Sequence, residues 1–458
     1  MPNKPRVVIV GGGLAGCECA LALARYEIPV TIVEQKPERF SPAHRNADLA
    51  ELVCSNSLRS ADPTAAVGEL KTEMTELGSA VMDAADETRV PAGKALAVDR
   101  EHFAAAMTRR IEDAPNVTLE RRHVPSLDED TLQQALDEGG AVVIAAGPLA
   151  SESLSESIAA ALGAEHLYFY DAIAPIVAAD SLNMDICFRA SRYGADGGDS
   201  EDGDYLNCPM TETEYDHFVE ALLAGEKAPC REFEKEIHFE GCMPVEALAE
   251  RGRLTLAYGS FKPVGLVDPR TGEQPFAVIQ LRAENREGGS YNLVGCQTKL
   301  TYPEQKRIFR LVPGLENAEF ERMGSVHRNT FVNSPRVLSP RGDLLARPGV
   351  YLAGQITGVE GYVESAAHGL WAGHSLGARL AGLGEVAPPP ETTVLGALLA
   401  HLQRETKNFQ PSNGNFGLTP ALNRRAPKRK RKELYAQRAR EDYAAWLQAS
   451  SHILRLGS

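Results

Sequence analysis

Aromatic side chains are scarce in this sequence of 458 residues, since Phe, Trp and Tyr together make up 6% of it. A binding surface built mainly on aromatic stacking therefore has little material. Cysteine is scarce as well, with eight residues and no C-x-x-C pair, which excludes a disulfide-dense secreted scaffold and favours a reducing compartment. No apolar run reaches the length of a membrane span, so we expect a cytoplasmic protein that does not bind a membrane.

Positive charge is in deficit over the whole chain, with 48 Lys and Arg against 62 Asp and Glu and a formal net charge of −14. This total disfavours a polyanionic partner unless cations gather in one place. They do so at 424–432 (RRAPKRKRK), where seven of nine side chains are basic. That run is a candidate contact for an RNA backbone, and an ordinary solvated surface stretch is the alternative.

The first 34 residues have the pattern of a nucleotide-binding βαβ unit. A β-branched run at 7–10 (VVIV) predicts a strand, and it ends in the glycine turn 11–16 (GGGLAG). The small residues of 17–26 predict a helix, and 29–34 (PVTIVE) predict a second strand. This order of strand, glycine turn, helix and strand is typical of a dinucleotide site.

Three glycines of the turn match G-x-G-x-x-G, whose glycines permit a tight turn, close approach of a pyrophosphate and close helix packing. The helix N-terminus adds partial positive charge. An acid at the end of the second strand can accept hydrogen bonds from an adenosine ribose. The residues predicted to contact the dinucleotide are therefore Gly11, Gly13, Leu14, Ala15, Gly16 and Glu34.

Two later apolar runs, 141–146 (AVVIAA) and 350–353 (VYLA), predict further parallel strands of the same sheet. Residues 348–373 give a strand, a glycine turn and a helix, the form in which many flavoproteins present a helix N-terminus to the flavin. FAD is therefore favoured over NAD as the tightly held cofactor, and a merely packed glycine-rich helix start is the alternative. The candidate cofactor-binding residues here are Gly354, Gln355, Gly358, Gly361 and Tyr362.

We predict an α/β protein with a Rossmann-like FAD-binding domain of the glutathione-reductase type and an inserted α+β domain. The sequence pattern changes between 186 and 324, where an acidic low-complexity turn and segments of alternating apolar and polar residues replace long helical patterns. We therefore assign 1–185 and 325–458 to the FAD-binding domain, the latter with the basic C-terminal extension, and 186–324 to the insertion.

Longer motifs identify a family more specifically than the glycines do. They are GGGLAG, FSPAHRNADLAELVCSNSLRS, VPAGKALAVDR, FYDAIAPIV, YLNCPM, FEGCMPVE, KPVGL, PGLENAEF, HRNT and GQITGVEGYVESAA. With these segments the chain resembles the folate- and FAD-dependent tRNA uracil-5-methyltransferase family (TrmFO, short GidA-type) from about residue 5 to about residue 420. It departs from the family pattern in an acidic insertion near 195–204 and in the basic C-terminal extension.

The resemblance implies that 5,10-methylenetetrahydrofolate gives a one-carbon unit to C5 of a T-loop uridine in tRNA, to form 5-methyluridine. Reduced flavin supplies the electrons, with NADPH or NADH as the external reductant. It also implies binding to the tRNA T-arm, and we expect a monomer. The same chemistry on ribosomal RNA, a small-molecule flavin oxidoreductase and the related wobble-uridine enzyme are the alternatives, the last disfavoured by chain length.

This chemistry requires a thiolate, because C5 of uracil is a poor nucleophile until a group adds at C6. The resemblance assigns that role to Cys242 and a role near the flavin to Cys54. Cys17 and Cys19 lie on the first predicted helix as packing residues. The remaining cysteines, which are Cys187, Cys208, Cys230 and Cys296, have no metal-ligand spacing, so no metal is expected.

Four further positions in the motifs have two interpretations each. His44 and His327 could hydrogen-bond flavin or folate, or could be ordinary core or surface histidines. Arg100, after Asp99, could hold a phosphate or the folate tail, or could form a structural ion pair. The ring of Tyr362 could stack on a pterin or flavin, or could simply pack.

Overall fold

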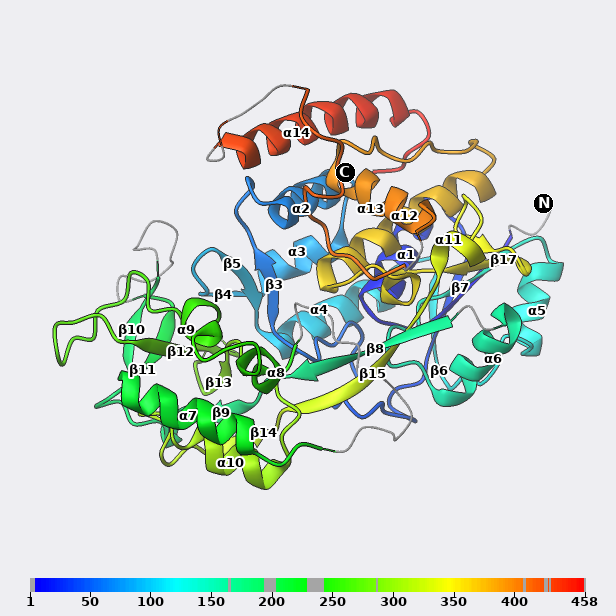
Figure 1. Cartoon of the computed structure of the whole chain (residues 1–458). Coiled ribbons are helices and arrows are strands. Elements are labelled where there is room, and N and C mark those ends of the chain that lie inside the picture. Colours follow the sequence, from blue (N-terminus) through cyan, green and yellow to red (C-terminus); the bar gives the residue numbers. More distant parts are fainter. Residues whose placement is uncertain are drawn as a thin grey trace.

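The structure is a computed structural model that describes residues 5–163, 166–192, 203–228, 243–285, 287–406, 409–423, 427 and 430–456. The side chains of 166–173 and 326–330 lie outside this description. Figure 1 shows two units side by side, joined by a long two-stranded ribbon of β8 (His166–Ile173) and β15 (Ser325–Val332).

The larger unit is built on a six-stranded sheet. Its strands, in spatial order, are β16 (Asp343–Leu344), β17 (Arg347–Leu352), β7 (Ala141–Ile144), β1 (Val7–Val10), β2 (Val30–Glu34) and β6 (Val117–Arg121). All neighbours are parallel except β16 and β17. The predicted strands at 7–10, 29–34, 141–146 and 350–353 are therefore confirmed as members of one sheet.

Both faces of this sheet are buried because side chains alternate along each strand. Val7 and Ile9 point into a core on one side, and Val8 and Val10 point into a second core on the other. The first core is covered by α1 (Leu14–Ala24), α2 (Ala66–Glu76), α3 (Ala80–Glu87), α4 (Arg100–Glu112) and α12 (Tyr362–Leu380). The second is covered by α5 (Asp130–Asp137), α6 (Glu152–Leu162) and α11 (Ser334–Val337).

Helix α12 lies very close to α1 because glycines face the α1 backbone. A Cβ added at Gly369 would lie 2.2 Å from the Ala15 carbonyl oxygen, and one at Gly373 would lie 2.6 Å from that of Cys19. Larger side chains at these positions would push the two helices apart. The contact fixes the N-terminus of α12 beside the glycine turn that precedes α1.

The smaller unit has its own core under a second six-stranded sheet. The strands are, in order, β10 (Phe188–Ala190), β11 (Tyr205–Met210), β12 (Ala277–Ala283), β13 (Ser290–Leu293), β9 (Ile176–Ala178) and β14 (Phe320–Arg322). Its helices are α7 (Glu212–Ala224), α8 (Val245–Ala249), α9 (Thr255–Tyr258) and α10 (Tyr302–Phe309). Because β9 precedes residue 186, we propose that the domain boundaries lie in the β8–β15 ribbon.

A three-stranded sheet of β3 (Ser57–Ser60), β5 (Ala95–Val98) and β4 (Arg89–Val90) lies between the two units. The chain ends in α13 (Val394–Gln403) and α14 (Arg431–Ser450), and α14 covers α2 at the top of Figure 1. Tyr443 and Trp446 of α14 are buried in the first core. The basic run 424–432 lies mostly outside the described residues, which include only 427 and 430–432 of it.

Candidate active site

The turn between β1 and α1 has no room for side chains at two of its glycines. Gly11 has φ +108°, and an added Cβ would lie 2.5 Å from the Ala145 carbonyl oxygen. A Cβ on Gly16 would lie 2.0 Å from the Gly11 carbonyl oxygen, whereas a Cβ on Gly13 would meet nothing within 4 Å. Gly13 therefore leaves open space in front of the α1 N-terminus, which is the space that a pyrophosphate requires.

Glu34 fixes the other side of this turn. Its Oε2 accepts a hydrogen bond from the Gly12 amide at 2.7 Å, and its Oε1 accepts one from the Lys36 amide at 2.9 Å. The carboxylate is 7% exposed and lines the cleft beside the turn. Two backbone donors therefore hold it at the strand end where an adenosine ribose was predicted to bind.

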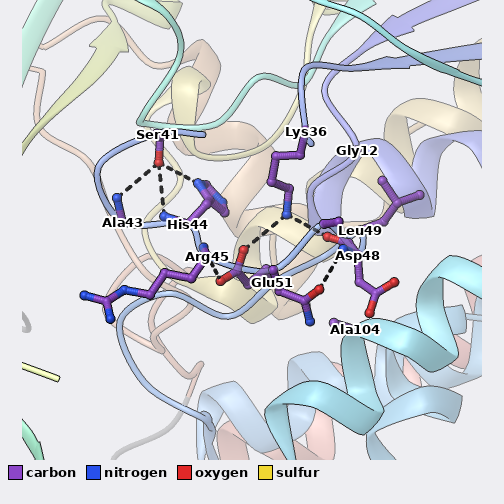
Figure 2. A network of polar contacts seen from close by, with 12 residues as sticks. Gly12, Lys36, Ser41, Ala43, His44, Arg45, Asp48, Leu49, Glu51 and Ala104 are labelled. Carbon is purple, nitrogen blue, oxygen red and sulfur yellow. Dashed lines mark hydrogen bonds and ion pairs between the residues drawn. The ribbon is translucent and has the colours of Figure 1, made fainter. Parts of the chain in front are cut away.

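Figure 2 shows the loop that follows β2, which forms one wall of the cleft. The Lys36 ammonium donates to the Asp48 carbonyl at 2.6 Å and pairs with Glu51 at 3.2 Å, and the Arg45 amide donates to Glu51 at 2.9 Å. His44 Nδ1 lies 2.6 Å from Ser41 Oγ. Burial, and next the charge of Lys36, lowers the pKa of His44, so this cleft residue is neutral at pH 7.

The second glycine turn connects β17 to α12 through a 3-10 helix, η3 (Gly354–Thr357). The Gly354 amide donates to His368 Nδ1 at 3.2 Å, and Gln355 Nε2 donates to Glu360 Oε2 at 2.8 Å. Burial lowers the pKa of His368 to about 4, which keeps its Nδ1 available as an acceptor. Side chains thus brace this turn, and two of its residues, Gly354 and Gln355, line the cleft.

One cleft of about 1290 Å³, its open mouth included, brings most of the predicted residues together. Those that line it are Gly11, Gly13, Leu14, Ala15, Glu34, Cys54, Gly354, Gln355 and Tyr362. Gly16, Gly358 and Gly361 do not line it. Gly16 packs on the Gly11 carbonyl, Gly358 on the Phe409 ring, and Gly361 precedes the first turn of α12 with φ +116°.

Cys54 lies in a loop, as expected, and that loop is held from both ends. The Cys54 amide donates to the Tyr362 hydroxyl at 2.6 Å, and the Ser55 amide donates to the same oxygen at 3.3 Å. Arg100 donates to the Leu52 carbonyl at 2.7 Å. Burial, and next the charge of Cys54, raises the pKa of Tyr362, so its hydroxyl remains protonated. Tyr362 thus holds the cysteine loop through its hydroxyl, and the same residue lines the cleft.

Other predicted residues have more ordinary roles or lie outside the described residues. Arg100 forms a buried ion pair with Glu284, which is the structural one of its two predicted roles. Asp99 caps α4, because its side chain accepts a hydrogen bond from the His102 amide at 3.1 Å. Cys242 lies outside the described residues, and so does the side chain of His327.

Several further residues that were not predicted from the sequence line the same cleft. The loop after β7 contributes residues 145–151, the segment directly after β6 contributes Arg122 and His123, and the first turn of α12 contributes Ser365. The signal was available, because the carboxyl ends of parallel strands meet at one edge of a sheet. Gly147 and Pro148, directly after a predicted strand, could have been assigned to the site on that ground.

The described residues contain no helix that is both long and apolar enough to cross a bilayer. Nor do they contain a group of three or more His, Cys, Asp or Glu side chains placed to hold a metal ion. Cys187 and Cys208 lie with their sulfur atoms 3.5 Å apart in the core of the smaller unit, away from the cleft.

The parallel sheet and its two glycine turns define a Rossmann-like FAD-binding fold, which confirms the predicted fold class. Residues 6–383 match the family described as glucose inhibited division protein A (GidA). Solved Aquifex aeolicus GidA, in its form I crystal, superposes with a TM-score of 0.67 at 17% identity, over 99% of this chain and 78% of that one. At that identity the likeness concerns the fold.

Two relatives match nearly the whole chain and carry the name methylenetetrahydrofolate--tRNA-(uracil-5-)-methyltransferase TrmFO. The one from Oleidesulfovibrio alaskensis is 64% identical over 438 residues, 96% of both chains. The one from Nitratidesulfovibrio vulgaris is 63% identical over 439 residues, 96% of this chain and 91% of the relative. The chain therefore belongs to the TrmFO family, as its motifs predicted.

Proposed function

We propose that the chain methylates C5 of a T-loop uridine in tRNA, with methylenetetrahydrofolate as the one-carbon donor, FAD as the bound cofactor and NADPH or NADH as the reductant. The observation that carries this proposal is the position of Cys54. Its loop opens onto the cleft that the two glycine turns form, and Tyr362, the first residue of α12, holds it there. A reactive thiol beside a dinucleotide site is what this reaction needs.

The residues of the cleft suit FAD. The open space at Gly13 and the α1 N-terminus would hold the pyrophosphate, Glu34 would hold the adenosine ribose, and the turn at Gly354 and Gln355 would face the flavin end. Reduced flavin supplies electrons when it is bound. The chain's own contribution is to fix these backbone donors and to keep Cys54 at the same cleft.

We assign the addition to uracil C6 to Cys242, as the family resemblance implies. Addition of the Cys242 thiolate to C6 makes C5 nucleophilic toward the one-carbon unit. Loss of the C5 proton and of the thiolate then restores the C5–C6 double bond, and reduced flavin would supply the electrons that turn the transferred methylene unit into a methyl group. Cys54 then assists removal of the C5 proton or protects the activated cofactor. The division of roles between the two cysteines is part of the proposal.

Basic side chains from both units support a polyanionic substrate in spite of the net negative charge. Arg322 of β14 reaches across to donate to the Ala43 carbonyl at 3.1 Å, within the electrostatic reach of Arg45 and Arg100. Burial lowers the pKa of Arg322, and those two arginines lower it further. Arg100 is paired with Glu284, but Arg45 is exposed and Arg322 is partly exposed, and these two can attract phosphates locally, whatever the total charge of the protein.

Reconstitution tests the function directly. Purified protein is incubated with methylenetetrahydrofolate, NADPH or NADH, and an unmodified tRNA transcript, and the nucleosides are analysed for 5-methyluridine. We expect product with the parent protein and at least about a thousandfold less with Cys54→Ala or Cys242→Ala, each with its flavin retained. Cys187→Ala, which removes a thiol away from the cleft, should keep the parent activity.

The alternatives predict different results. A small-molecule flavin oxidoreductase would retain its activity after Cys242→Ala and would make no 5-methyluridine. A ribosomal RNA enzyme would methylate an rRNA transcript in preference to tRNA. Absence of 5-methyluridine while the flavin is being reduced would contradict the proposal.

A further inference from the structure

Arg282 is a buried cation at the junction of the two units. It lies at the end of β12, is 6% exposed, and belongs to the smaller unit. Its Nε donates to Asn56 Oδ1 at 2.7 Å, and its guanidinium also donates to Ser55 Oγ at 2.6 Å. Both acceptors belong to the larger unit and directly follow Cys54 in the chain.

The hydrogen-bond partners of Arg282 are neutral. Among the residues that the structure describes, no carboxylate forms an ion pair with Arg282, and Glu284, the acid that most affects its charge, pairs with Arg100 instead. Burial lowers the pKa of Arg282, and the charges of Glu284 and Tyr205 oppose that change. A buried guanidinium stays protonated, and without a counter-ion it is destabilising.

The same side chains fix the position of Cys54. Asn56 Nδ2 donates to the Ala283 carbonyl at 2.9 Å and to the Val98 carbonyl at 3.0 Å, so it bridges the two units. Arg282 and this bridge hold the loop after Cys54, while Tyr362 holds the Cys54 amide.

Among the described residues, the titratable groups that interact electrostatically with Cys54 include Tyr362 at the start of α12, Arg100 at the start of α4 and Arg282 of β12. Tyr362 is neutral and Arg100 is paired with Glu284. Of these three groups, Arg282 is therefore the one that carries a charge without a carboxylate partner among the described residues.

We propose that Arg282 is a positioning residue that stabilises a negative charge on the Cys54 sulfur. The reactivity of this thiol then depends on the position of the smaller unit, which carries Arg282, against the larger unit. The inference rests on the proposed function, because it assumes that the Cys54 thiol takes part in the reaction. The counter-ion that Arg282 lacks is then the thiolate that forms when Cys54 releases its proton to water. Arg282 acts through Cys54 and contacts neither the uridine nor the flavin in this account.

The test is the pH dependence of Cys54 alkylation by iodoacetamide in the flavin-bound protein, followed by peptide mass spectrometry. In Arg282→Gln the pH of half-maximal rate should rise by about one unit, so that alkylation at lower pH slows about tenfold. Arg282→Lys keeps the charge and should stay within about threefold of the parent. Arg189→Gln is the matched control, because Arg189 of β10 also bonds to a neutral group, the Tyr291 hydroxyl, at 3.0 Å.

A second variant should shift the pH of half-maximal alkylation in the opposite direction, and its result does not depend on whether Arg282→Gln folds. Glu284→Gln removes the acid that offsets the charges of both Arg282 and Arg100, so the half-maximal pH should fall, and it should fall less when Arg282→Gln is added. Flavin content and thermal unfolding confirm that each variant is folded. An unchanged profile in Arg282→Gln, a Lys variant as slow as the Gln variant, or an unchanged or raised midpoint in Glu284→Gln would each overturn the role of charge.

This experiment separates the inference from the proposed function, because alkylation needs no RNA or folate. If Cys54→Ala still forms 5-methyluridine while Arg282→Gln shifts the alkylation profile, then the role of Cys54 in methylation is wrong and the effect of Arg282 stands. If methylation depends on Cys54 and the profile does not move, the inference about Arg282 is wrong.

Discussion

The glycine turn at 11–16 and the cysteine loop at 52–56 border the same cleft, yet they are built in opposite ways. The turn depends on missing side chains, since a Cβ at Gly16 would overlap the Gly11 carbonyl. The loop depends on side chains that arrive from distant elements, namely Arg100, Arg282 and Tyr362. A binding surface made of backbone can therefore be read from six consecutive residues, whereas the environment of a reactive thiol requires the whole fold.

The largest effect should come from filling the turn. Gly16→Ala places a methyl group 2.0 Å from a backbone oxygen that cannot move without separating α1 from β1, so we expect a loss of about 3 kcal/mol or more and little bound flavin. Gly13→Ala is the matched control: its Cβ meets no protein atom, so stability should change by less than about 0.5 kcal/mol. Flavin affinity should nevertheless fall at least about tenfold in Gly13→Ala. Denaturant unfolding and flavin titration distinguish the two.

A smaller effect should come from loosening the loop while the turn stays intact. Tyr362→Phe removes the oxygen that accepts from the Cys54 and Ser55 amides, at a cost of about 1 to 3 kcal/mol in the position of the loop. We expect methyl transfer in a single turnover to slow about tenfold or more, with flavin content unchanged. Tyr351→Phe, which removes a hydroxyl that bonds to Arg379 instead, should leave the rate as it is. Equal rates in parent and Tyr362→Phe would show that the loop needs no such support.

The smallest effect on the cleft is expected from His374, which forms hydrogen-bond contacts far from both the glycine turn and the cysteine loop. His374 of α12 lies 3.0 Å from the Tyr26 hydroxyl and 3.1 Å from the Leu77 carbonyl, and burial, followed by the charge of Arg25, lowers its pKa from 6.5 to about 3. The unfolded chain takes up this proton below pH 6.5 and the folded chain does not, so stability falls as the pH falls. Between pH 7 and pH 5 the group accounts for about 2 kcal/mol.

His374→Asn should therefore lose about 2 kcal/mol less than the parent over that interval, as measured by urea unfolding at the two pH values. Flavin binding and Cys54 alkylation should keep the parent pH profile, because His374 lies away from the cleft. An identical loss of stability in both proteins would show that His374 titrates normally when folded.

The sequence predicted the parts of the fold that are encoded locally. The strands at 7–10 and 141–146 are apolar and end at a glycine, and the strand at 29–34 is a β-branched run after a proline, so their type and their parallel arrangement followed from a few residues. The glycine turn and the acid at Glu34 followed for the same reason. The motifs around Cys54 identified the family, although they carried no information about which side chains surround that thiol.

What the sequence could not give are contacts between segments far apart in the chain. Arg282 meets Asn56 only because β12 of the smaller unit ends at the junction, and no pattern near either residue predicts this. Arg100 had two interpretations of equal weight, and its ion pair with Glu284 became visible only in three dimensions. The second sheet likewise includes β9 from before the expected boundary, because pairing across a sheet is not visible in a local pattern.

The strand order of the main sheet has a consequence for synthesis of the protein. β7 pairs with β1 on one side and with β17 on the other, and β17 follows the entire smaller unit in the chain. A nascent chain therefore carries an unfinished sheet, with one edge of β7 open, until the ribosome has passed residue 352. During that interval the open edge is exposed to mispairing and aggregation, so the vulnerable stage of folding is set by the length of the insertion.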